Sequence, residues 1–193
     1  MTEISFLTGE LLLAAVWITV RLFVNLRCRS FSLKREALLL LMYVNLAVLL
    51  RITFFPMERL NGQIQPLLFD ASRILPPRVN LIPFVHILRF DTKRDMLLNL
   101  IGNTAMFVPG GIILPALYPR LRSFLRTAAA GAGISLCIEL LQLLFFDRAT
   151  DIDDLILNTA GCMIGYLIYA AVRLCLRAGR NRKNHPNNRR AVS

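Results

Sequence analysis

Hydrophobic residues occur along this chain in five long runs, separated by polar and mostly charged segments. An α-helix needs roughly 20 apolar residues to cross the hydrocarbon core of a bilayer, and each run comes close to that length. The runs cover residues 4–26, 36–55, 95–117, 125–146 and 152–176. The pattern therefore predicts an all-α fold, a polytopic bundle of about five membrane-spanning helices.

Composition supports this fold class and changes how the positive charge is interpreted. The chain has 193 residues, is 55% hydrophobic and carries a formal net charge of +11. In a water-soluble protein this charge would suggest a nucleic-acid partner, but here the basic residues flank hydrophobic runs. Basic residues in that position determine membrane topology, so we expect no binding of nucleic acid.

The basic residues predict an orientation. They gather between the first and second runs, between the third and fourth runs, and after the fifth. Successive helices cross the membrane in opposite directions, so these three regions share one side, which the positive-inside rule assigns to the cytoplasm. We therefore expect the N-terminus outside and the C-terminus inside, with residues 177–193 forming a basic, disordered cytoplasmic tail.

The connector between the second and third runs, residues 57–94, differs from an ordinary loop. It contains several prolines and the apolar segment NLIPF at residues 80–84. The connector is too polar to span the membrane and too apolar to lie wholly in water. We expect an interfacial or partly re-entrant excursion outside the bundle.

Cysteines and the N-terminus indicate no disulfide framework and no cleaved leader. Cys28, Cys137, Cys162 and Cys175 show neither a CxxC motif nor metal-ligand spacing. We expect them to act as small hydrophobic residues. The first run lacks the basic start and small-residue cleavage site of a signal peptide, so we expect it to remain as a membrane anchor.

Polar residues within the runs concentrate in the half of the membrane nearest the exterior, when depth is estimated at about 1.5 Å per residue. Asn99 with Asn103, and Glu139 with Gln142, have the spacing of neighbours on one helix face. A charge at the bilayer centre costs about 2.5 to 3.5 kcal/mol, so such groups need partners or a function. The candidate polar site consists of Arg51, Asn80, Asn99, Asn103, Glu139, Gln142, Arg148, Asp151, Asp154 and Asn158.

The start of the fifth run combines part of this site with a packing surface. At helical spacing, Asp151, Asp154 and Asn158 share a face. Gly161 and Gly165 form a small-xxx-small pair, which lets a neighbouring helix approach closely.

Two structural explanations compete with a binding site. The aspartates could only cap the fifth helix, since carboxylates favour its positive N-terminal end. The acids and amides could also form an internal network in which Arg51 or Arg148 neutralises Glu139 and an aspartate. A ligand pocket open to the outer leaflet is the third option, because hydrogen bonds between helices in membranes contribute only about 1 kcal/mol each.

Five segments, in this order, resemble the VanZ-like family of small membrane proteins. They are RITFFP at 51–56, NLIPF at 80–84, NLIGNTAMFVPGG at 99–111, IELLQ at 138–142 and RATDIDDLILNTAG at 148–161. The resemblance implies a VanZ-like transmembrane domain over residues 1–176 and a multi-pass protein of the bacterial cell membrane. The family's named member is associated with reduced sensitivity to the glycopeptide antibiotic teicoplanin. The resemblance implies no established reaction.

Three functions remain as alternatives. The favoured one is binding or modification of a membrane lipid, a lipid-linked wall precursor or a lipoglycopeptide at the outer leaflet, with lowered teicoplanin sensitivity as a consequence. The second is an intramembrane enzyme acting on a lipid headgroup or phosphodiester, with Glu139 as general base and a divalent cation held by Asp151 and Asp154. These three carboxylates are the candidate metal ligands, and no other cofactor is expected. The third is a lipid or small-molecule transporter, which the lack of an evident inverted repeat disfavours.

Overall fold

Five long helices form the body of the described part of the chain in the computed structural model, and each is long and apolar enough to cross a membrane. The structure describes residues 2–28, 32–55, 59–60, 62–70, 79–85, 90, 92–146 and 150–184. The helices are α1 (Phe6–Cys28), α2 (Leu33–Phe54), α3 (Lys93–Leu117), α4 (Phe124–Gln142) and α5 (Ile152–Asn184). The predicted all-α membrane bundle is confirmed.

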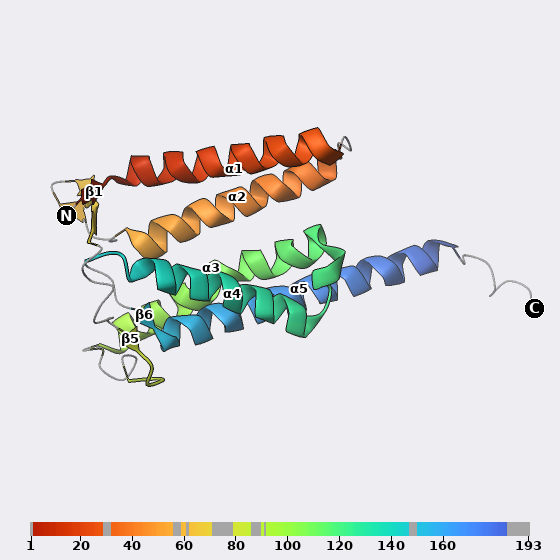
Figure 1. Ribbon diagram of the computed structural model, residues 1–193. Helices are drawn as coiled ribbons and strands as arrows, with labels where there is room; N and C mark the ends of the chain where they lie inside the picture. The colour runs from red at the N-terminus through yellow and green to blue at the C-terminus, as the bar shows by residue number, and fades with distance from the viewer. Residues whose placement is uncertain are drawn as a thin grey trace, which may run out of the picture.

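The two ends of the bundle differ in character (Figure 1). At one end lie the α1–α2 connection, the α3–α4 connection with the short 3₁₀ helix Pro119–Leu121, and the C-terminal part of α5. We call this the basic end because Arg27, Lys34, Arg35, Arg120 and Arg122 lie there. The opposite end, which carries the N-terminus and the short strands, is the polar end. Which end faces the cytoplasm stays a prediction.

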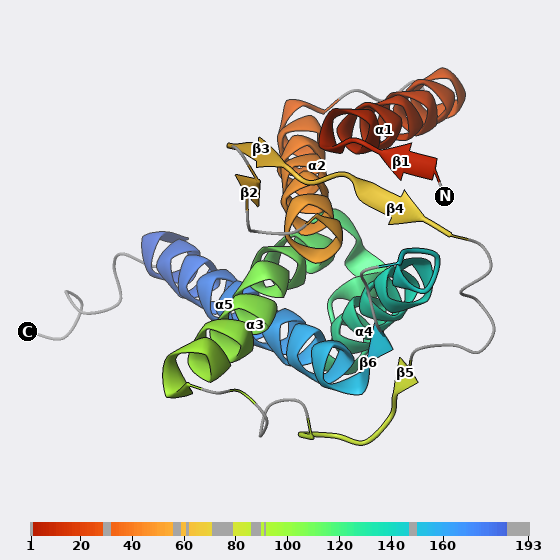
Figure 2. The same cartoon turned by 90° about the vertical axis from the view of Figure 1, so that its left-hand side faces the viewer.

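Helices α3 and α5 approach each other closely, as the small-xxx-small spacing predicts. A Cβ added at Gly161 would overlap the backbone carbonyl of Thr104, and one added at Gly165 would overlap that of Val108. Figure 2 shows α3 crossing α5, with α4 beside α5 and α1 outermost, next to α2. Glycine at these two positions therefore lets the backbones of α3 and α5 approach each other closely.

The hydrophobic core is small, and many large apolar side chains are exposed. No residue is buried in the most apolar 18-residue window of α1. Such exposure fits a surface surrounded by lipid rather than water. The buried apolar clusters consist of Met42, Ile113, Leu114 and Cys162, of Leu49, Met106 and Phe107, and of Phe54, Phe55 and Leu67.

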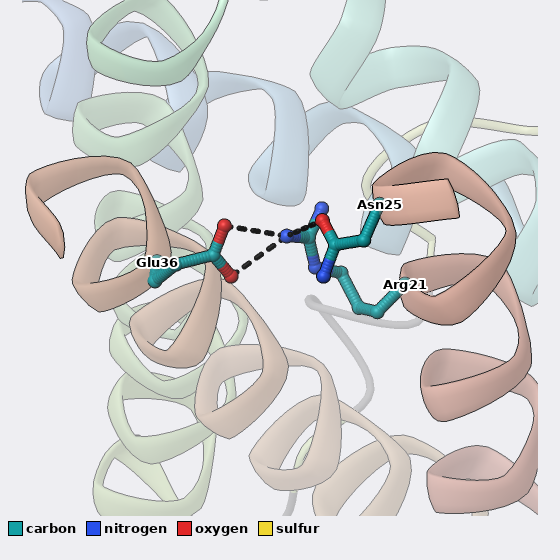
Figure 3. Close-up of polar contacts among 3 residues, drawn as sticks. All are labelled: Arg21, Asn25 and Glu36. Carbon is teal, nitrogen blue, oxygen red and sulfur yellow. Dashed lines mark hydrogen bonds and ion pairs between the residues drawn. The ribbon is translucent and has the colours of Figure 1, made fainter. Parts of the chain in front are cut away.

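A polar contact joins α1 to α2 near the basic end (Figure 3). The guanidinium Nη2 of Arg21 donates to both carboxylate oxygens of Glu36, at 2.6 and 2.7 Å, and to Oδ1 of Asn25 at 3.0 Å. The contact combines charge with hydrogen bonding, so it stabilises the packing of the outermost helix.

Short strands, which the sequence did not predict, cover the polar end. Strand β1 (Thr2–Ile4) runs antiparallel to β4 (Leu67–Phe69), and β2 (Arg59–Leu60) runs antiparallel to β3 (Gln63–Ile64). Strand β5 (Val79–Asn80) pairs in parallel with β6 (Thr150–Asp151). The connector is thereby attached to the N-terminus and to the start of α5. Its position at a membrane interface stays a prediction.

Two helix ends differ from the approximate spans that the sequence predicts. The fourth helix ends at Gln142, before the predicted end at Phe146, because the chain turns so that Phe145 packs edge-on against Phe54 and the N–H of Phe146 donates to Leu68 at 2.9 Å. The fifth helix continues to Asn184, through the start of the predicted disordered tail. Arginine and lysine are good helix formers and are favourable at a helix C-terminus, so the helix continues. Residues 185–193 lie outside the described part.

Candidate functional site

A cavity of about 570 Å³ lies at the polar end, between α2, α3, α4 and α5. Six of the ten residues predicted from sequence line it, and they come from three different helices. The lining consists of Ile52, Thr53, Leu98, Asn99, Gly102, Asn103, Met106, Glu139, Gln142, Asp154 and Asn158. The polar lining side chains are carboxylates, amides and one hydroxyl, and no lysine, arginine or histidine is among them in the described part of the chain.

Asn103 and Asp154 meet across the cavity wall. The side-chain amide of Asn103 on α3 donates to Oδ1 of Asp154, in the first turn of α5. Asn99 lies one turn before Asn103 and lines the same cavity, as its spacing predicts. The i, i+4 spacing therefore identified the face of α3 that lines the cavity.

Glu139 is 2% exposed and connects α4 to the start of α5. Its carboxylate Oε2 accepts the backbone N–H of Asp151 at 2.9 Å, and its backbone carbonyl accepts the hydroxyl of Thr150 at 2.7 Å. Within the described residues no lysine or arginine pairs with it. Glu139 therefore adds a buried carboxyl group to the cavity, and its described hydrogen bond comes from the backbone.

Arg51, which the network explanation pairs with Glu139, does not line the cavity. Its Nη1 donates to the backbone carbonyl of Phe55 at 3.0 Å, just beyond the end of its own helix, and its guanidinium lies 5.7 Å from the ring centroid of Phe6. A cation near a helix C-terminus is favourable, which explains this position. Arg148 lies outside the described residues.

Two lining amides have an oxygen without a donor. Nε2 of Gln142 donates to the carbonyl of Thr53 at 2.7 Å, and Nδ2 of Asn158 donates to Oγ of Ser135 at 2.9 Å. The amide oxygens of Gln142 and Asn158 are buried and have no hydrogen-bond partner in the described structure. A buried acceptor without a donor costs about 1 to 3 kcal/mol, so donors from a ligand would be favourable here.

Asp151 and Asn80, two further residues of the predicted site, are not among the residues that line the cavity. Asp151 lies in β6, before the fifth helix, and its Oδ1 accepts from Nδ2 of Asn80 and from the N–H of Asp153, both at 3.0 Å. The second bond has the form of a cap at the start of α5. The capping explanation therefore applies to Asp151, whereas Asp154 lines the cavity.

Asp153 is a buried residue that the sequence reasoning missed. It is 3% exposed, and its Oδ1 accepts the N–H of Phe84 in the connector at 2.6 Å, while its Oδ2 is buried without a partner in the described chain. Helical spacing placed Asp153 away from the face of Asp154. The connector returns over this side of α5, and only its NLIPF segment could have indicated that contact.

The candidate metal ligands do not form one group among the described residues. In the part of the chain that the structure describes, no three or more histidine, cysteine, aspartate or glutamate side chains are placed to hold a metal ion. Asp151 binds Asn80, and only Glu139 and Asp154 of the three candidates line the cavity. Among the described residues the three candidate carboxylates therefore do not form one cluster, and a divalent cation held by them stays a hypothesis.

Comparison with known proteins adds a family assignment. A family model described as VanZ/LLP1 matches residues 39–174. Protein VanZ of Enterococcus faecium is 35% identical over 91 residues, which is 47% of this chain and 52% of that protein. The chain thus spans about half the length of that curated relative. No solved structure matches the chain significantly. Because the family match extends from α2 through most of α5, the chain belongs to the VanZ/LLP1 family and is a multi-pass bacterial membrane protein.

Proposed function

We propose that the protein binds the polar head of a membrane amphiphile in this cavity, at the outer leaflet. The amphiphile is a membrane lipid, a lipid-linked wall precursor or a lipoglycopeptide. The observation that carries the proposal is the convergence of six polar side chains from α3, α4 and α5 on one cavity within apolar helices. Polar groups at such depth are expensive, so their gathering favours a functional site.

The cavity's chemistry favours a head rich in N–H and O–H donors. Glu139 and Asp154 bring carboxylates, and Gln142 and Asn158 bring amide oxygens without donors in the described structure. Hydrogen bonds to ionised acceptors are roughly twice as strong as neutral ones. An ammonium, hydroxyl or peptide N–H group fits this lining better than a bare phosphate, because a phosphate brings acceptor oxygens to a lining that already consists largely of acceptors.

The depth of the cavity along α5 supports a ligand whose head lies at headgroup level. Asn158 follows the start of α5 at Ile152 by six positions, which corresponds to a depth of about 9 Å at 1.5 Å per residue. A head that enters from the polar end reaches the cavity while its tail stays in the leaflet. With the predicted orientation, this leaflet is the outer one.

The same chemistry offers a route to lowered teicoplanin sensitivity. Teicoplanin carries a glycopeptide head on an acyl chain, and its peptide and sugar groups supply many donors. A protein that holds such an amphiphile in its cavity would interfere with the drug's anchoring in the membrane. The link to this antibiotic comes from family resemblance and is part of the proposal.

Binding to purified protein in nanodiscs tests the proposal. We expect saturable binding of teicoplanin or of a lipid-linked wall precursor to the wild type, at least tenfold weaker binding to Asp154→Asn, and unchanged binding to Glu3→Gln. Glu3 is an exposed carboxylate at the same end of the bundle and does not line the cavity, so it is a matched control. Absence of saturable binding of both probes to the wild type would contradict the proposal.

A catalytic variant of this proposal has one observation in its favour. Glu139 and Asp154 line the same cavity, and two carboxylates beside one ligand can serve as general acid and base. Lipid incubated with the nanodiscs should then yield a product by mass spectrometry, and Glu139→Gln should abolish it. If the lipid is unaltered after long incubation, the catalytic variant is contradicted and binding without catalysis remains as the proposal.

A further inference from the structure

A second hollow, which we call the apolar groove, lies between α1, α2 and α4 and has a volume of about 520 Å³. Its lining is apolar apart from the hydroxyl of Thr53 and the thiol of Cys137. The lining residues are Leu13, Leu46, Leu49, Leu50, Thr53, Phe54, Ala130, Gly133, Ile134, Cys137, Ile138 and Leu141.

The groove has the depth of one leaflet. Its α4 lining extends from Ala130 to Leu141, near the polar end, eleven positions or about 16 Å at 1.5 Å per residue. The hydrocarbon core of a bilayer is about 30 Å thick, so the groove spans roughly half of it. It therefore runs from headgroup level to the middle of the membrane.

The groove adjoins the polar cavity. Thr53, in the last turn of α2, lines both, and its carbonyl accepts the side-chain amide of the cavity residue Gln142 at 2.7 Å. We propose that the apolar groove holds an acyl or prenyl chain of the amphiphile whose head occupies the cavity. This inference rests on the proposed function and adds a subsite for the acyl or prenyl chain of the ligand.

Binding of the acyl or prenyl chain in the groove depends energetically on binding of the head in the cavity. Lipid tails around the protein are as apolar as leucine, so moving a chain from the bilayer into the groove gains little hydrophobic free energy. Specific occupancy of the groove must therefore come from the head bound in the cavity. An ordinary boundary lipid would occupy the groove regardless of the cavity.

Three glycines permit a matched test. An added Cβ meets no atom within 4 Å at Gly133, which lines the groove, at Gly102, which lines the cavity, or at Gly179, which lines neither. Leucine at Gly133 fills the groove, leucine at Gly102 fills the cavity, and leucine at Gly179 is the control. Because Cys137 is exposed in the groove, Cys137→Phe is a second, independent groove-filling variant.

The experiment is photo-crosslinking in phosphatidylcholine nanodiscs. One probe is a phosphatidylethanolamine with a diazirine in one acyl chain, and a second is teicoplanin with a diazirine in its acyl chain. Labelled peptides are mapped by mass spectrometry, and chain-free glycerophosphoethanolamine and deacylated teicoplanin serve as competitors for the head site. Circular dichroism and thermal stability check the fold of each variant.

We expect saturable labelling by at least one probe, concentrated on residues 130–141 and 46–54. Gly133→Leu, Cys137→Phe, Gly102→Leu and the matching chain-free competitor should each lower it at least fivefold, whereas Gly179→Leu should leave it unchanged. Groove labelling that ignores Gly102→Leu would indicate a boundary lipid and overturn the inference. Saturable binding that Gly102→Leu abolishes and that neither groove variant changes would also overturn it, with the proposed function standing. Absence of saturable labelling by both probes would overturn the groove inference, whereas the proposed function would stand if the lipid-linked precursor still bound in the nanodisc assay.

Discussion

The side-chain amide of Asn103 on α3 donates a hydrogen bond to the carboxylate of Asp154 on α5. The bond lies at the polar end of the two helices that the glycines Gly161 and Gly165 hold in close contact. Close packing of the backbones brings the two side chains within reach of each other. The carboxylate is thereby fixed in the wall of the cavity rather than free to move away from it.

A double-mutant cycle should detect this bond. We expect Asn103→Ala and Asp154→Ala to be coupled by about 1 kcal/mol in the free energy of unfolding, the size typical of hydrogen bonds between membrane helices. Unfolding of the reconstituted protein measured by steric trapping gives the four stabilities. A parallel cycle with Asn99→Ala in place of Asn103→Ala is the control. Coupling near zero for the first pair would contradict the role assigned to the bond.

Alanine substitutions should distinguish a glycine that lies in the tight α3–α5 contact from a glycine with open space beside it. Gly161→Ala places a Cβ against the Thr104 carbonyl, so we expect a loss of about 1 to 3 kcal/mol, as in overpacked cores. At Gly102 no atom lies within 4 Å, and alanine there should be neutral or stabilising by about 0.5 to 1 kcal/mol. Thermal unfolding in one detergent compares the two. Equal effects would show that α3 and α5 do not pack as described.

Local periodicity explains which parts of the site were predictable. Asn99 with Asn103 and Glu139 with Gln142 share faces because helix geometry fixes the positions of residues three or four apart. Helix periodicity does not specify which helix each face meets. The partner of Asn103 became evident only with the packing of α3 on α5, and Ser135 as the partner of Asn158 gave no signal because a small hydroxyl residue resembles a packing residue.

The remaining differences have local and tertiary causes. One explanation paired Arg51 or Arg148 with Glu139, yet the carbonyl of Phe55, four residues after Arg51, is a local acceptor that the Arg51 side chain reaches. Asp153 was assigned to no site, because its burial depends on the connector returning over α5. The strands at the polar end are two or three residues long, too short for a pattern of alternating residues to indicate them.

Removal of one member of the Arg21–Glu36 pair should cost more than removal of both. The side chains are 16% and 26% exposed, between surface and buried pairs, so Arg21→Met should lower the free energy of unfolding by about 2 kcal/mol. Arg21→Met combined with Glu36→Gln leaves no unpaired charge and should regain part of that loss. Chemical unfolding in mixed micelles measures both, with Lys34→Met as an exposed control at the same end. A double variant less stable than the single one would refute the pairing argument.

Asn80 should hold the connector against the start of α5. Its amide donates to Asp151, and its Oδ1 accepts the N–H of Ile82 at 3.2 Å, so Asn80→Ala removes both bonds. We expect faster hydrogen exchange in residues 79–85 of this variant, while α3 and α5 keep their protection. Exchange followed by mass spectrometry in nanodiscs gives the rates, and Leu81→Ala, which alters an exposed neighbour, is the control. Unchanged exchange in Asn80→Ala would mean that strand pairing alone holds the connector.

The predicted orientation can be tested with two single cysteines in a chain whose native cysteines are replaced by alanine. Ser5 lies at the polar end and Arg120 at the basic end, and both are exposed. The positive-inside rule places the basic end in the cytoplasm, so a membrane-impermeant maleimide added to intact cells should label Ser5→Cys and spare Arg120→Cys. Permeabilised cells should show labelling of both, which controls for reactivity. The reverse pattern in intact cells would place the cavity at the inner leaflet. The cavity would then be closed to teicoplanin arriving from outside, whereas its capacity to hold a lipid head would remain.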